Sequence, residues 1–191
     1  MDTKLTGKTR IESDLIGARE IPAEALYGVQ TLRGIENFSI SKFRLSEYPL
    51  FIKGLAITKM AAAMANFELG LLTVEQKDAI IAACGEILDG KHHDQFPVDM
   101  IQGGAGTTTN MNANEVIANR ALELMGHERG EYQYCSPNDH VNCSQSTNDA
   151  YPTAIHIGMY FKHLQLLPHL EELIASFRKK GEEFSQIIKM G

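Results

Sequence analysis

The stretch QGGAGTTTNMN, residues 102–112, and the stretch SPNDHVNCSQSTND, residues 136–149, are the two polar clusters around which the chain is organised. In the first cluster, three glycines allow backbone conformations that are closed to other residues and leave amides open to a ligand. The same cluster carries the three hydroxyls of Thr107, Thr108 and Thr109. A loop of this composition suits an anion.

A helix is expected directly after the first cluster. Asn112 is followed three residues later by Glu115, the spacing of an N-cap with its reciprocal partner. This spacing predicts a helix from about Ala113 to Met125 that stops at Gly126. The free amides and the dipole at a helix start both favour negative charge, so the loop before it is expected to bind an anion.

The second cluster repeats this arrangement, because Ser146, Thr147 and Asn148 precede an amphipathic run that opens near Pro152. One interpretation of the two clusters is that both helix starts face the same carboxylate. The alternative is that each cluster merely caps its own helix, as Gly, Thr and Asn often do. The sequence contains no GxxxxGK[ST] motif, and GGAG alone is no nucleotide fingerprint.

The two clusters carry a resemblance to a known family. Residues 94–116, DQFPVDMIQGGAGTTTNMNANEV, and residues 136–154, SPNDHVNCSQSTNDAYPTA, resemble the aspartase and fumarase superfamily. Residues 12–38, ESDLIGAREIPAEALYGVQTLRGIENF, resemble the opening of the same enzymes, so the likeness covers nearly the whole chain.

Within the superfamily the details are more similar to aspartate ammonia-lyases (aspartases) than to fumarases. Ala105 and Thr147 stand where fumarases usually carry Ser, and SPNDH at residues 136–140 replaces a fumarase-like HPNDD. Cys143 departs from the pattern, since the family usually has Lys at this place. Any charge pairing by that lysine is therefore absent here.

The resemblance implies a mainly α fold with a short extended or hairpin N-terminus. Residues 1–145 would form the N-terminal lyase domain, and residues 146–191 would open a long helical bundle that is truncated here and that assembles as a homotetramer in the family. The alternatives are a fumarase or another superfamily lyase, and a binding or assembly domain without chemistry.

The resemblance also implies reversible elimination of ammonia from L-aspartate to give fumarate, through an aci-carboxylate and without an organic cofactor. By motif, Thr107, Ser146 and Thr147 correspond to residues that hold the β-carboxylate, and Asn148 to the residue that contacts the amino group. The family's serine base lies in a GSS loop, and a histidine lies in a TH pair. Neither motif occurs in this sequence, so no catalytic base is assigned and the chain alone is expected to be inactive.

Composition narrows the remaining function classes. A formal net charge of −6 and the lack of a long basic run argue against a nucleic-acid surface. The sequence has three cysteines without a CxxC pattern, which favours a reducing compartment. No apolar signal region opens the chain and no apolar run reaches about 18 residues, so we expect a cytoplasmic protein without membrane spans.

Other elements follow from local signals. Residues 1–20 indicate extended or hairpin structure leading into a helix with Pro22 in its first turn. Pro49 predicts the start of a helix that runs through Phe67 and is ended by Gly70. Thr73 and Gln76 form a capping box for a helix expected to reach Leu88 before Gly90. Residues 150–190 show a helical pattern that Pro168 is expected to kink or split, with Gly181 weakening it further.

His92, His93 and Asp94 are the most metal-like cluster. Adjacent residues of a regular helix cannot both face one ion and no further ligand is spaced nearby, so we interpret them as a solvated loop and assign no metal site. Cys84 lies on an apolar helix face and is expected to be buried and inert.

Overall fold

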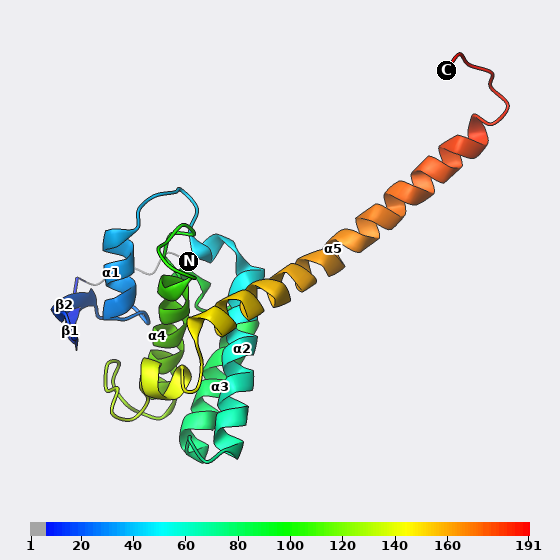
Figure 1. Ribbon diagram of the computed structural model, residues 1–191. Coiled ribbons are helices and arrows are strands. Elements are labelled where there is room, and N and C mark those ends of the chain that lie inside the picture. The colour runs from blue at the N-terminus through cyan, green and yellow to red at the C-terminus, as the bar shows by residue number, and fades with distance from the viewer. Residues whose placement is uncertain (1–6) are drawn as a thin grey trace.

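The computed structural model describes residues 7–191, and most of these residues are helical (Figure 1). The chain begins with a hairpin of two antiparallel strands, β1 (Thr9–Asp14) and β2 (Gly17–Pro22). In the turn between them, Oδ1 of Asp14 accepts the amides of Ile16 and Gly17 at 2.9 and 3.1 Å. The predicted N-terminal hairpin is confirmed from residue 7 onward, and residues 1–6 lie outside the described residues.

Helix α1 spans Val29–Asn37, so the prediction of Pro22 in a first helical turn is wrong. Pro22 is the last residue of β2, where its missing N–H costs no interior ladder bond. The guanidinium of Arg10 donates to the carbonyls of Pro22, Ala25 and Tyr27 at 2.7–3.0 Å. These bonds hold the segment after β2 in a non-helical course until α1 begins.

Two helices follow the predicted bounds closely. Helix α2 spans Pro49–Glu68 and helix α3 spans Val74–Leu88, and they are joined through Gly70 at φ 75°. The Oγ1 of Thr73 accepts the amide of Gln76, whose side chain accepts the amide of Thr73 in return. The sequence-predicted capping box and both helix ends are therefore confirmed.

Helix α4 spans Thr107–Leu124 and starts earlier than predicted. Gly106 takes φ 89° and turns the chain directly into the helix, so Asn112 lies inside α4 and is fully buried. The predicted capping box of Asn112 and Glu115 is wrong, because the Glu115 carboxylate instead binds backbone amides at the start of α1. The predicted end before Gly126, at φ 82°, is confirmed.

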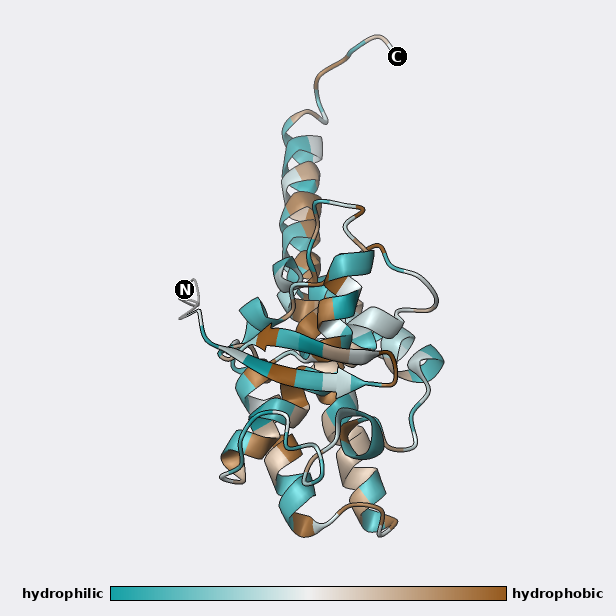
Figure 2. Cartoon of the chain, turned by 90° about the vertical axis from the view of Figure 1, so that its left-hand side faces the viewer, coloured by the Kyte–Doolittle hydropathy of each residue, from teal (hydrophilic) through white to brown (hydrophobic). Residues whose placement is uncertain are grey.

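Helix α5 spans Thr147–Glu183 and leaves the compact part of the molecule as a long projection (Figure 1). The predicted split at Pro168 is wrong, since α5 continues through that residue and through Gly181, and the alternative of a kink there stays a prediction. The Leu164 carbonyl, which Pro168 leaves without its helical donor, belongs to an exposed residue, so water can bind it. Figure 2 shows hydrophobic residues alternating with hydrophilic ones along this projection.

Three short turns complete the chain: the 3₁₀ turns Leu45–Glu47 (η1) and His93–Gln95 (η2), and the π-helical turn Pro137–Val141 (η3). The core lies where α2, α3, α4 and the first turns of α5 meet. Glycines bring α2 and α5 close together, because a Cβ on Gly158 would lie 3.1 Å from the Leu50 carbonyl and one on Gly54 would overlap the Ala154 carbonyl.

Within residues 7–191, α2 is the helix that has the length and hydropathy of a membrane span. It packs against α3 and α5 and buries Lys59 and Asn66 among its neighbours. This is the pattern of a core helix. The proposed boundary between residues 145 and 146 coincides with the start of α5, and the division into two domains stays a prediction.

Candidate active site

The two polar clusters meet where α4 and α5 begin. The Nδ2 of Asn110, one turn into α4, donates a hydrogen bond of 3.2 Å to Oγ1 of Thr147, the first residue of α5. The ring of Tyr151 packs directly over the Cα of Gly106, where any side chain would overlap it. The two helix starts are thus in direct contact, and each presents free backbone amides.

The four residues assigned by resemblance lie at this place. Thr107 and Thr147 are the first residues of α4 and α5, Ser146 is the N-cap of α5 and Asn148 follows. Thr147 is half-buried and the other three are exposed. Within the described chain, Thr107 makes no hydrogen bond to Ser146 or Asn148, and the binding roles of all four residues stay predictions.

The three threonines of the first cluster have different surroundings. Thr109 is buried, and its polar groups already have a partner in Gln102. Its amide donates to Oε1 of Gln102 at 2.8 Å, and its Oγ1 accepts from Nε2 of the same residue at 2.6 Å. The Cγ2 of Thr108 lies against Gly34 of α1. Thr107 is exposed at the start of α4, and so it is the threonine of this cluster best able to reach a ligand.

The capping alternative holds in part. The Oγ of Ser146 accepts the amide of Asn148 at 3.2 Å, which is the geometry of an N-cap. A capping hydroxyl still has its own proton to donate. Thr147 differs, because its Oγ1 takes its hydrogen bond from a side chain of another helix rather than from the α5 backbone.

Sequence reasoning missed Lys59, which binds the polar side chains that lie behind the two helix starts. Its side chain is fully buried, and its Nζ donates to Oδ1 of Asn110 at 2.7 Å, Oδ1 of Asn142 at 2.9 Å and Oε1 of Gln145 at 3.0 Å. Burial lowers the pKa of Lys59 to about 7, while the neighbouring Cys84 acts in the opposite direction. The available signal was a single cation in the apolar run LAITKMAAAMANF at residues 55–67.

The loop before α5, residues 142–145, is held in place by side-chain amides of its own residues. Nδ2 of Asn142 donates to the Gln145 carbonyl at 3.0 Å, and Nε2 of Gln145 donates to the Val141 carbonyl at 2.8 Å. The Cys143 carbonyl accepts from Nδ2 of Asn66 on α2 at 2.8 Å. The Cys143 side chain, at the position where the resemblance expects Lys, is half-buried beside Ser144.

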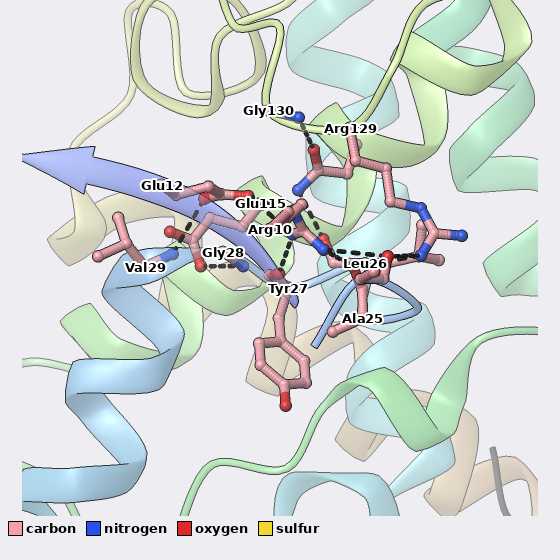
Figure 3. Close-up of polar contacts among 12 residues, drawn as sticks. Arg10, Glu12, Ala25, Leu26, Tyr27, Gly28, Val29, Glu115, Arg129 and Gly130 are labelled. Atoms are coloured by element: carbon pink, nitrogen blue, oxygen red, sulfur yellow. Dashed lines mark hydrogen bonds and ion pairs between the residues drawn. The ribbon is translucent and has the colours of Figure 1, made fainter. Parts of the chain in front are cut away.

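A second buried polar cluster joins α4, β1 and the start of α1 (Figure 3). Glu115 accepts the amides of Gly28 and Thr31, and Glu12 accepts the amide of Val29 at 3.1 Å, so two carboxylates cap the start of α1. The Tyr132 hydroxyl donates to Glu12 at 2.9 Å. Burial, followed by the nearby Glu12, raises the pKa of Tyr132 far above its usual range. These contacts are structural.

Two cavities open on the described chain. One of about 590 Å³ lies beside the α1 start and is lined by Asp14, Gln30, Tyr132, Pro137 and Asn138 among others. The other, of about 680 Å³, lies between α2 and α5 and is lined mainly by apolar side chains. Neither is lined by Thr107, Ser146, Thr147 or Asn148.

His92, His93 and Cys84 have structural surroundings. His92 contacts Glu86 at 2.8 Å and His93 donates to the Ile87 carbonyl at 2.9 Å. Among residues 7–191, no group of three or more His, Cys, Asp or Glu side chains is placed to hold a metal ion. Cys84 is buried as predicted, and this burial raises the pKa of its thiol to about 12.

Curated relatives resemble the chain over almost its whole length. It is 58% identical over 182 residues to the aspartate ammonia-lyase of Pseudomonas canavaninivorans, covering 95% of this chain and 38% of that enzyme. It is 55% identical over 188 residues to the aspartate ammonia-lyase of Escherichia coli K12, covering 98% and 39%. The chain therefore spans about two fifths of the length of these relatives.

Solved structures share the fold. A fumarate lyase:delta crystallin from Brucella melitensis matches with a TM-score of 0.93 and 52% identity, covering 96% of this chain and 40% of that one. A class II fumarase from Schistosoma mansoni matches with a TM-score of 0.89 and 38% identity, covering 96% and 39%. The expected mainly α fold with an N-terminal hairpin is confirmed.

A family model described as Lyase matches residues 17–191, which include both polar clusters and all of α5. The likeness to aspartate ammonia-lyases, first indicated by the cluster motifs, is confirmed by relatives at 55–58% identity. On this evidence the chain belongs to the lyase family.

Proposed function

We propose that residues 1–191 form the N-terminal part of an aspartate ammonia-lyase, which reversibly eliminates ammonia from L-aspartate to give fumarate. The observation that carries this proposal is the identity of 55–58% with aspartate ammonia-lyases over at least 95% of the chain. The joined starts of α4 and α5 support it physically, since the substrate and the product are both dicarboxylates.

The chemistry needs donors that face developing charge. A base removes the proton at C3, the electron pair moves into the β-carboxylate, and the resulting aci-carboxylate carries two negative charges. The pair then returns to form the C2–C3 double bond as the C2–N bond breaks and ammonia leaves. Hydroxyls and amides fixed before the reaction stabilise the doubly charged form more than the substrate.

We assign this task to Thr107, Ser146 and Thr147, and contact with the amino group to Asn148. Support comes from their position at two adjoining helix starts, where amides and dipoles favour an anion. The base is proposed to come from sequence outside residues 1–191, in keeping with relatives more than twice as long. The chain alone is therefore proposed to be inactive.

Assembly as a homotetramer in a reducing cytoplasm completes the proposal. The projecting half of α5 exposes Leu167, Leu170, Ile174 and Phe177, which need partner helices to cover them. The three cysteines are free thiols, which suits that compartment.

The test is the absorbance of fumarate formed by the full-length protein from L-aspartate, with L-malate as the competing substrate. Turnover of aspartate without turnover of malate is expected. Turnover of malate alone would favour the fumarase alternative, which the match to a class II fumarase keeps in consideration. If residues 1–191 alone formed fumarate at the rate of the full-length protein in the same assay, the proposal that the base lies outside these residues would be contradicted.

A further inference from the structure

Lys59 is the buried charged group of the site whose partners are all neutral. Its Nζ is surrounded by the side-chain oxygens of Asn110 from α4 and of Asn142 and Gln145 from the loop before α5. Within residues 7–191 its hydrogen-bond partners are these three neutral oxygens rather than a carboxylate, and its titratable neighbour is the Cys84 thiol of α3. Three acceptors match the three N–H groups of an ammonium.

These contacts fix which way the Asn110 amide faces. Lys59 Nζ meets three side-chain oxygens and therefore acts here as the donor, so the oxygen of the Asn110 amide faces it. The Nδ2 of the same amide then points away, toward Oδ1 of Asn142 at 3.0 Å and Oγ1 of Thr147 at 3.2 Å. Oδ1 of Asn142 favours the same orientation, because it accepts from Nδ2 of Asn110, and Lys59 donates to this oxygen as well. Loss of the ammonium would thus remove one of the two contacts that orient the amide and a hydrogen bond that supports the other.

The orientation of Asn110 in turn sets the direction of the Thr147 hydroxyl. An amide nitrogen can only donate, so Oγ1 of Thr147 accepts from Asn110 and its own proton remains free for another acceptor. With the Asn110 amide reversed, an oxygen would face Thr147 and the hydroxyl would donate inward. A carboxylate at the helix starts would then lose a donor.

We propose that Lys59 is a positioning residue of the site: it orients the Asn110 amide so that the Thr147 hydroxyl donates its proton outward to a bound carboxylate. The inference rests on the proposed function, because it assigns a ligand carboxylate to Thr147. It goes further in naming a residue of α2, which touches no ligand, as the source of a hydrogen-bond direction.

Asn110→Asp is the sharpest test, because aspartate has nearly the same shape and gives Lys59 an ion-pair partner. Its carboxylate cannot donate, so Thr147 must turn its proton inward, and Oδ1 of Asn142 loses the donor it has in Asn110. A merely structural role of Lys59 predicts a loss of kcat that does not depend on the Thr147 hydroxyl, because the new negative charge would repel a bound dicarboxylate whether or not that hydroxyl is present. The proposal predicts retained or raised melting temperature with kcat lowered roughly tenfold to a thousandfold, the range for loss of one such donor.

The test uses the full-length protein with L-aspartate, comparing Asn110→Asp, Thr147→Val and the double variant. If Lys59 and Asn110 act through the Thr147 hydroxyl, Asn110→Asp should lower kcat less than threefold once that hydroxyl is gone. The inhibition constant of succinate, an unreactive dicarboxylate, should change less than kcat. The proposal would be overturned if the losses of kcat in the two single variants multiplied in the double variant. Full activity of Asn110→Asp would overturn it as well.

Lys59→Met provides the second arm, with Lys53→Met as its control. Lys53 is half-buried on the same helix, and among the described residues it makes none of the hydrogen bonds that join Lys59 to Asn110, Asn142 and Gln145. Lys53→Met should keep its kcat, whereas folded Lys59→Met should lose at least tenfold. If Lys59→Met does not fold, Asn110→Asp alone decides. If the unsubstituted protein does not act on aspartate, the proposed function is refuted. If that protein is active and the variants are equally active, only the role of Lys59 is refuted.

Discussion

The carboxylate of Glu115, in the middle of α4, accepts the amide of Gly28 at the start of α1 at 2.8 Å. The amides of Gln30 and Thr31 bind the same carboxylate at 2.8 and 3.0 Å. Burial raises the pKa of Glu115, and these amides act in the opposite direction. One side chain of α4 therefore holds the start of α1 in place.

Glu115→Gln should destabilise the fold, because the replacement puts an NH₂ group where the α1 amides need an acceptor. A buried donor without a partner costs about 1–3 kcal/mol. Glu128→Gln, at an exposed position, is the control and should change stability by less than about 0.5 kcal/mol. Urea denaturation measures both, and equal midpoints for the two variants would contradict the assigned role of Glu115.

Thr147→Val in the full-length protein separates a ligand role from a structural one. The substitution keeps the shape of the side chain and removes its hydroxyl, so kcat should fall about a hundred- to a thousandfold if the hydroxyl faces the aci-carboxylate. The α5 cap is Ser146, so the melting temperature should change little. Thr153→Val, exposed in the next turn of α5, should keep full activity. A lowered melting temperature with unchanged kcat would make Thr147 structural.

Ser146→Ala should show the complementary effect on stability. Loss of an N-cap costs about 1 kcal/mol. That loss should appear in the melting temperature of residues 1–191 alone, where no turnover is expected. An unchanged melting temperature would mean that the bond from Ser146 to the Asn148 amide does not support α5.

Association of residues 1–191 should depend on the apolar side of α5. Phe177 is 69% exposed in the projecting half of that helix, and patches of this kind favour self-association. Phe177→Glu should lower the molar mass that light scattering reports at high concentration, whereas Ser176→Glu, at the adjacent exposed position, should not. A monomeric original chain would show that this side needs no partner.

Acid should weaken the contact between α3 and α4. The guanidinium of Arg120 binds Glu86 at 2.6 and 2.8 Å and holds the pKa of Glu86 down at about 2. A carboxyl whose pKa is lower in the fold stabilises it above its ordinary value of 4.5 and loses that contribution as the pH falls toward 2. As the pH falls from 4.5 toward 2, the urea midpoint should therefore decrease less steeply in Glu86→Gln than in the original protein. Parallel pH profiles would argue against this coupling.

Local sequence patterns predicted the structure correctly where a single short segment determines it. The capping box of Thr73 and the stop at Gly70 both depend on residues within a few positions of each other, and both are confirmed. Glu115 has the same local spacing from Asn112 but is drawn to the amides of α1, more than eighty residues away. That competition is tertiary, so spacing alone could not reveal it.

The candidate site shows the same limit. Motifs indicated the two helix starts, and their contact through Asn110 and Thr147 agrees with that interpretation. Lys59 escaped notice because its surrounding residues indicate an apolar core, and its three partners come from segments 51–86 residues away. A cation in an Ala- and Met-rich helix is a clue that only the folded arrangement explains.

The close crossing of α2 and α5 has a consequence for variation in this chain. A methyl group on Gly54 would displace the Ala154 carbonyl, which lies two helical turns from Thr147 on the same rigid helix. A change of volume at a buried position that meets no ligand would thus shift the first residue of α5. We expect Gly54 to tolerate as few replacements in a mutational library as the hydroxyl-bearing residues themselves.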